Sequence, residues 1–116
     1  MSIEVSLNIF SGRTNPAWFL DETKASELGR LLANLSNPSE KKSERRLGYR
    51  GFLIRGGPLV EAGERIRVFR GVVELPGRSF VDRNRNLERW LLESAGAAIP
   101  PDLRAEVLED LEAQLR

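Results

Sequence analysis

The residues of this chain best suited to chemistry are its arginines. Of 116 residues, 18 are Lys or Arg and 17 are Asp or Glu, and only three of the basic residues are Lys. Guanidinium groups offer a planar fork of N–H donors, which grips a carboxylate or a phosphate at two points. Most of them lie in the middle of the chain: Arg45, Arg46, Arg50, Arg55, Arg65, Arg67, Arg70, Arg78, Arg83, Arg85 and Arg89.

The near-zero net charge of the chain hides a strong segregation. Residues 41–89 carry a net charge of +7, whereas residues 1–40 carry −2 and residues 90–116 carry −4. Two arrangements are open. The arginines can share one outward sheet face and attract anions, or the acidic C-terminal segment can cover the basic strands and neutralise them internally. Isolated surface charges with no specific role are a third possibility.

Aromatic residues are interleaved with these arginines, namely Tyr49, Phe52 and Phe69. Basic and aromatic side chains mixed on a sheet are typical of surfaces that bind single-stranded nucleic acid. We therefore name Tyr49, Arg50, Arg67 and Arg70 as candidate residues for contact with a ligand or partner. No ribonucleoprotein, helix-turn-helix or zinc-knuckle signature accompanies them.

A second candidate site is the loop at residues 11–16, which reads Ser-Gly-Arg-Thr-Asn-Pro and is followed by Trp18. Arg13, Asn15 and Trp18 bring together a cation, an amide and an indole. Loops at strand ends often carry binding groups, and this set suits a carboxylate, a phosphate or a sugar. The alternative is an ordinary turn, in which Asn15 and Pro16 shape the backbone and Trp18 enters the core.

Carboxylates form a third candidate. Glu74 and Asp82 flank the Pro76-Gly77 turn, and Glu4 lies on the first strand. Paired carboxylates can transfer protons or bind a divalent cation. With so many arginines nearby, ion pairing is the alternative role.

The missing residue types exclude much enzyme chemistry. The chain has no Cys and no His. It therefore has no disulfide, no thiol nucleophile, no Ser-His-Asp triad, and neither Cys nor imidazole as a metal ligand. We expect a protein without catalytic residues, metal or cofactor, although enzyme activity based on carboxylates stays open.

Alternating and helical patterns predict the elements that position these residues. Residues 3–10 alternate as a half-buried strand, and strands are also expected at 47–55, at 65–75 with a bulge near Gly71, and as a short edge at 78–81. Leucines at helical spacing predict a helix over 22–35 capped by Asp21. Two more helices are expected, one from near residue 82 or 84 to Gly96 and one after Pro100-Pro101.

These elements predict an α+β fold for residues 1–116 as a single compact domain. We expect a small antiparallel sheet of three to four strands with two to three helices packed mainly on one face. The expected order is β-α-β-β-(β)-α-α. The C-terminal helix, residues 101–116, carries a leucine stripe and an acidic face, and the preceding prolines would allow it to detach.

The sequence predicts a cytoplasmic protein, with neither a signal peptide nor a membrane span. The expected function is non-enzymatic binding of a protein partner or of a second copy, through the aromatic and arginine surface and the C-terminal helix. The alternative is binding of an anion or a single-stranded nucleic acid by the arginine-rich strands.

Overall fold

The computed structural model describes residues 3–10, 12, 14–39, 48–56 and 64–113. The strands are β1 (Ile3–Leu7), β2 (Ala17–Phe19), β3 (Phe52–Gly56), β4 (Arg65–Phe69), β5 (Val72–Leu75) and β6 (Arg78–Val81). The helices are α1 (Glu22–Ala33), α2 (Asn86–Ser94) and α3 (Pro101–Ala113), with short 3-10 turns η1 (Arg83–Arg85) and η2 (Gly96–Ala98).

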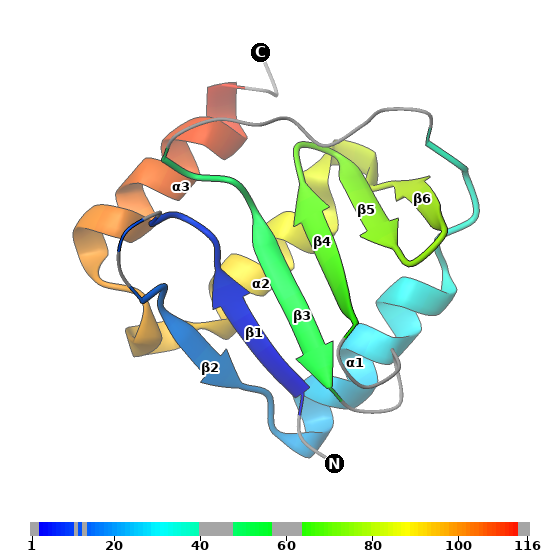
Figure 1. Cartoon of the computed structure of the whole chain (residues 1–116), viewed down its shortest axis with the longest axis horizontal. Helices are drawn as coiled ribbons and strands as arrows, with labels where there is room; N and C mark the ends of the chain where they lie inside the picture. Colours follow the sequence, from blue (N-terminus) through cyan, green and yellow to red (C-terminus); the bar gives the residue numbers. More distant parts are fainter. Residues whose placement is uncertain (1–2, 11, 13, 40–47, 57–63, 114–116) are drawn as a thin grey trace.

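All six strands form one antiparallel sheet in the order β2-β1-β3-β4-β5-β6. The three helices lie together on one side of this sheet, behind it in Figure 1. The α+β class and the antiparallel sheet are therefore confirmed. The opposite face of the sheet carries no helix in the described part of the chain.

The predicted number of strands, three to four, is wrong. One reason is that the continuous strand expected at 65–75 is a hairpin of β4 and β5. Arg70 and Gly71 have φ values of 48° and 81° and form its two-residue turn. A turn with two left-handed residues matches the twist of paired strands, so the shift in apolar phase at Gly71 reflects a reversal of the chain and not a bulge. The other reason is β2, a three-residue strand that the sequence pattern did not predict.

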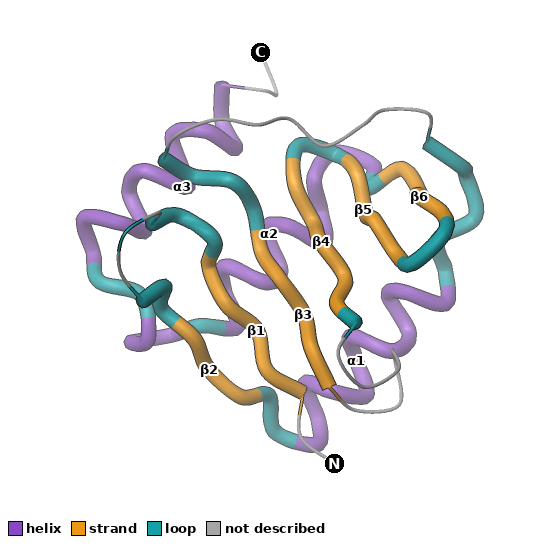
Figure 2. Tube along the Cα trace, viewed as in Figure 1, coloured by secondary structure: helices purple, strands orange, loops and turns teal. Residues whose placement is uncertain are grey.

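The two edges of the sheet differ (Figure 2). At β6, residues 37–39 add backbone hydrogen bonds: Val81 N donates to Asn37 O and Ser39 N donates to Ser79 O. At β2, the strand pairs with β1 and with no other described strand. Phe19 on β2 is 67% exposed and is the most exposed large apolar side chain among the described residues.

The core lies between the sheet and the helices. Its sheet side comes from alternate residues, such as Val5, Ile54 and Val68, which are fully buried. Leu28 of α1 and Leu111 of α3 are equally buried on the helix side. Burial of this apolar surface is the main favourable contribution to the stability of the domain.

The helices follow the predicted patterns closely. Asp21 caps α1, with Lys24 N donating to its Oδ1 at 2.8 Å. Pro101 is the first residue of α3, a position where its missing N–H costs nothing. The predicted end of this helix, residues 114–116, lies outside the described residues.

Candidate functional site

Among the described residues, three arginines stand on the sheet face that no described helix covers. They alternate along β3 and β4 with the fully buried Ile54, Ile66 and Val68, so their side chains point away from the core. We call this set the arginine face, and it consists of Arg55, Arg65 and Arg67. Arg55 and Arg65 are exposed and Arg67 is half-buried.

The strand register sets the charges that surround this face. Arg55 of β3 lies directly opposite Arg65 of β4. Like charges opposite one another in an antiparallel pair are destabilising. Glu4 on β1 faces Arg55 from the other side, and Glu74 on β5 faces Arg67.

A pocket of about 290 Å³ opens on this face. Its charged walls are Arg65 and Arg67 of β4 and Glu74 of β5. The apolar part of its lining is formed by Leu53, Leu75 and Pro76. We call it the arginine pocket. It combines guanidinium donors with apolar surface, as ligand sites commonly do.

Arg67, which lines this pocket, also has an unsatisfied donor. Its Nε is buried and has no hydrogen-bond partner among the described residues. Arg50 and Arg70 also have a buried, unpartnered Nε, but their terminal nitrogens are used: Arg50 Nη2 donates to Phe10 O and Arg70 Nη2 pairs with Asp110. A buried donor left without a partner costs about 1–3 kcal/mol, so Arg67 is the arginine with most to gain from an anion.

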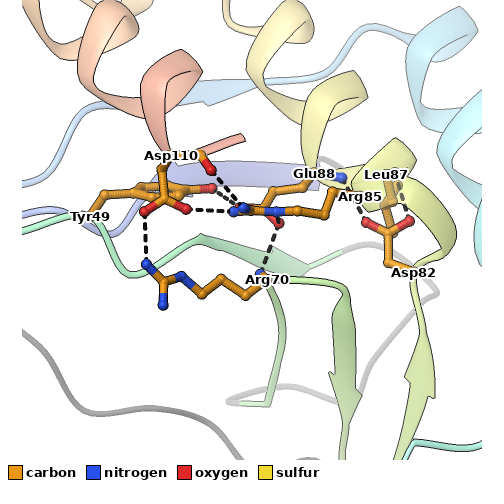
Figure 3. Close-up of polar contacts among 7 residues, drawn as sticks. All are labelled: Tyr49, Arg70, Asp82, Arg85, Leu87, Glu88 and Asp110. Atoms are coloured by element: carbon orange, nitrogen blue, oxygen red, sulfur yellow. Dashed lines mark hydrogen bonds and ion pairs between the residues drawn. The ribbon is translucent and has the colours of Figure 1, made fainter. Parts of the chain in front are cut away.

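A second group of charges is buried under the sheet, between α2, α3 and the β4–β5 turn. We call it the buried cluster, and it consists of Tyr49, Arg70, Arg85, Glu88 and Asp110 (Figure 3). The Glu88 side chain is fully buried, and Tyr49 and Arg85 are 2% and 4% exposed.

Each oxygen of Glu88 has donors from different parts of the chain. Oε1 accepts from Arg85 Nε and from the Arg70 backbone N, both at 2.9 Å. Oε2 accepts from the Tyr49 hydroxyl and from Arg85 Nη2. Burial and the neighbouring Glu88 carboxylate raise the pKa of Tyr49 well above its usual value, so the phenol stays protonated as a donor.

Asp110 connects α3 to this cluster. Its carboxylate pairs with Arg85 Nη2 at 2.9 Å and with Arg70 Nη2 at 3.1 Å. Burial alone would raise the pKa of Asp110, but the hydrogen bonds from Arg70 and Arg85 outweigh it and lower that pKa. Asp110 of the acidic helix therefore pairs internally with two of the basic residues, and Glu88 of α2 supplies a second carboxylate to Arg85. Internal neutralisation is confirmed for Arg70 and Arg85, whereas the arginine face points away from this helix.

An unusual backbone supports the cluster. Asn84 and Arg85 both have left-handed φ values, 56° and 54°. This conformation is costly for residues other than glycine. It turns the Arg85 side chain inward, where Glu88 and Asp110 hold the guanidinium between them (Figure 3).

The predicted carboxylate pair is not brought together. Glu74 lines the arginine pocket, whereas Asp82 is buried at the start of α2. Asp82 accepts from Leu87 N at 2.8 Å and from Glu88 N at 3.1 Å, so it caps the helix. Burial raises its pKa. It also lines a hollow of about 330 Å³ between α1 and β6, but both of its oxygens are occupied by the helix amides.

Two residues of the predicted loop site, Asn15 and Trp18, have structural partners. Asn15 Oδ1 accepts from Ile9 N and Phe10 N and closes the turn after β1. Trp18 is buried, with its indole N–H donating to Ser94 Oγ at 3.0 Å. Arg13 lies outside the described residues. Asn15 and Trp18 therefore have the ordinary structural roles that the sequence left as the alternative.

The remaining candidate contact residues lie in different parts of the structure. Tyr49 and Arg70 belong to the buried cluster, Arg50 donates to the Phe10 carbonyl, and Arg67 alone lines the arginine pocket. Sequence reasoning did not select Arg55, Arg65 and Glu74 together as a site. The shared strand parity of Arg65 and Arg67 was the available signal, but the register that adds Arg55 and Glu74 was not readable.

Comparisons with known proteins do not assign this site. Searches against protein family models, curated proteins and solved structures found no match to the chain. Within the described ranges, no group of three or more acidic side chains is placed to hold a metal ion. No described helix is both long and apolar enough to cross a membrane.

Proposed function

We propose that this protein is a non-enzymatic binding protein that holds an acidic segment of a partner protein on its arginine face. One observation about Arg67 carries the proposal. The Arg67 side chain lines an open pocket, and its buried Nε has no hydrogen-bond partner in the described structure. Arg65 lines the same pocket, and Arg55 opposite it on β3 extends the positive charge to a second strand. Carboxylates complement this surface because charge-assisted hydrogen bonds to guanidinium are among the stronger ones.

Nucleic acid fits this surface less well. A single-stranded nucleic-acid platform needs exposed rings on which bases stack. Tyr49, Phe52 and Phe69 are all buried, so the rings that suggested such a platform are in the core. Phe19 is exposed, but it stands on β2, two strands away from Arg55.

Catalysis explains the arginine pocket less well than binding does. The groups with shifted pKa values, Tyr49, Asp82, Arg85 and Asp110, all have protein partners. None of them lines the arginine pocket. Active sites usually place such groups within reach of the substrate.

Docking through a detached C-terminal helix stays a separate prediction. Val107 and Leu111 of α3 are fully buried, and Asp110 pairs with Arg70 and Arg85. Detachment would expose both side chains and break both ion pairs. The arginine face requires no such rearrangement.

Fluorescence anisotropy with a labelled eight-residue glutamate-rich peptide tests the proposal. We expect saturable binding that weakens with salt, because exposed charges are screened. The triple variant Arg55→Gln, Arg65→Gln, Arg67→Gln is expected to bind at least about tenfold more weakly, a loss of about 1.4 kcal/mol.

The matched control is Arg30→Gln, Arg83→Gln, Arg89→Gln, which removes the same charge from α1, η1 and α2. It should retain nearly all binding. Equal losses in the two triple variants would reduce the effect to net charge and overturn the proposal. Tighter binding of a uridine oligonucleotide than of the peptide would favour the nucleic-acid alternative. Light scattering of the free chain tests self-association, and a dimer that excludes the peptide would also contradict the proposal.

A further inference from the structure

The outer edge of β2 presents backbone groups that no described residue uses. Leu7 N of β1 donates to Pro16 O, directly before β2, at 2.9 Å. Backbone groups along an antiparallel strand point alternately to its two sides, so Trp18, two positions further on, also faces β1. The N–H and C=O groups of Ala17 and Phe19 therefore point away from β1, and β2 pairs with no other described strand.

The two edges of the sheet are protected to different degrees. At β6, residues 37–39 cover the edge with backbone hydrogen bonds, and the strand begins with the exposed Arg78. Proteins commonly cover or charge an exposed edge in this way. The sequence of β2 is Ala-Trp-Phe, without a charged side chain. Pro16 lacks an N–H on the side that faces β1, so it leaves the outward groups of β2 unchanged.

The side chains of β2 add an apolar contact to these backbone groups. Trp18 is buried in the core, whereas Ala17 and Phe19 are exposed on the sheet face that no described helix covers. Phe19 is 67% exposed. An uncovered strand edge beside an exposed aromatic ring is suited to pairing with a further strand.

A second copy of the same edge complements this one. Two-fold symmetry makes the paired β2 strands antiparallel. With the axis at Trp18, Ala17 of each copy lies opposite Phe19 of the other. Each of these two pairs exchanges two hydrogen bonds, so all the outward groups of both residues are used. The Phe19 ring then lies beside the small Ala17 side chain of the other copy, as a cross-strand pair on one face.

The charges around β2 favour the same arrangement. The acidic residues Asp21 and Glu22 follow the strand at one end only. Antiparallel pairing places the acidic residues of the two copies at opposite ends of the contact, which keeps like charges apart. Because residues 37–39 cover the other edge of the sheet, pairing through β2 ends at two copies (Figure 2).

We infer that two copies of this chain associate through their β2 edges, in antiparallel register with Ala17 opposite Phe19, to form one sheet across both copies. This inference goes beyond the proposed function and does not depend on it. Arg55 stands two strands away from β2, so the arginine face stays open in the dimer. A three-residue contact buries little surface, and we expect a weak dimer with a dissociation constant of about 0.1–1 mM.

Sedimentation equilibrium of the full chain, up to about 1 mM, tests the association. Phe19→Lys removes the exposed ring and places a charge on the edge, so we expect association to weaken at least about tenfold. Val81→Lys is the matched control, because Val81 is the other exposed large apolar residue among the described ones and lies on the covered edge. It adds the same charge and should leave association within about twofold of the wild type.

Amide hydrogen exchange followed by NMR tests the backbone pairing itself. In dilute solution the N–H groups of Ala17 and Phe19 have no acceptor and should exchange quickly. Raising the concentration to about 1 mM should slow both severalfold. The Trp18 N–H faces β1 in the single copy, so its exchange should change much less and serves as the internal control. Unchanged signals from the helices in Phe19→Lys show that this variant is folded.

Three outcomes overturn the inference. A chain that stays monomeric at about 1 mM excludes self-pairing, and would leave the edge to an extended segment of another protein. Equal association of Phe19→Lys and Val81→Lys would place the contact on another surface. Association without slower exchange at Ala17 and Phe19 would exclude the strand pairing. Binding of the acidic peptide is measured separately, and its failure would affect the proposed function alone.

Discussion

Arginines from one basic stretch of sequence have opposite environments in the buried cluster and on the arginine face. Arg85 is 4% exposed and donates to Glu88 and Asp110. Arg67, eighteen positions earlier, has a buried Nε that no described residue accepts from. Ion pairing inside the cluster offsets the cost of burying charge. Arginines close together in the sequence are therefore either paired with buried carboxylates or turned away from the core, depending on the fold around them.

The largest effect should come from removing the centre of the buried cluster. Glu88→Gln removes the fully buried carboxylate of the two that pair with Arg85, and we expect a loss of about 3–5 kcal/mol in the free energy of unfolding. Urea unfolding followed by circular dichroism measures it. Glu93→Gln, exposed on the same helix, is the control and should change stability by less than about 0.5 kcal/mol. A similar small change for Glu88→Gln would contradict the view that the cluster is a structural centre.

Loss of the α3 connection should have a smaller effect. Asp110→Asn weakens the contacts to Arg70 and Arg85, and we expect a cost of about 1.5–3 kcal/mol, the usual contribution of hydrogen bonds to charged groups. Glu109→Gln, the exposed neighbour, serves as the control in the same urea titration. Proteolysis near residue 100 should increase in Asp110→Asn alone if this carboxylate holds α3 in place.

The pH dependence of stability tests the contribution of Asp110 independently. Because the pKa of Asp110 is lower in the folded state than its ordinary value of 3.8, its contribution is fully present above that value. It is lost as pH falls through the folded pKa. Asp82 acts in the opposite sense, since its raised pKa makes the folded state hold a proton more tightly, and stability falls as pH rises through that pKa. Thermal unfolding from pH 2 to 6 should therefore show a flatter acid limb for Asp110→Asn than for the wild type.

On the arginine face, the expected effects on stability are the smallest and have the opposite sign. Arg65→Glu replaces the like-charged pair with Arg55 by an opposite-charged pair, so we expect a gain of about 0.2–1 kcal/mol. Binding of the acidic peptide should weaken in the same variant. A loss of stability, or unchanged binding, would show that Arg65 has a structural role as the cluster arginines do.

The candidate site could be predicted only in part. Arg67 was named as a contact residue, and the shared parity of Arg65 and Arg67 was readable from their spacing along one strand. Tyr49 and Arg70 were also named, but they are bound inside the molecule. Residue type and local spacing do not distinguish these outcomes, because the partners of Tyr49 and Arg70 come from α2 and α3, residues 39 and 40 positions away.

Local patterns were sufficient for the helices, the cap at Asp21 and the alternation of β1, because each depends on neighbours within a few residues. The number of strands, the order of the sheet and the pairing of Arg55 with Arg65 depended on contacts between distant segments. Which arginines are neutralised also depended on contacts between distant segments. Charge is a property of the residue, but its cost and its availability depend on burial and on partners, and only the packed chain sets those.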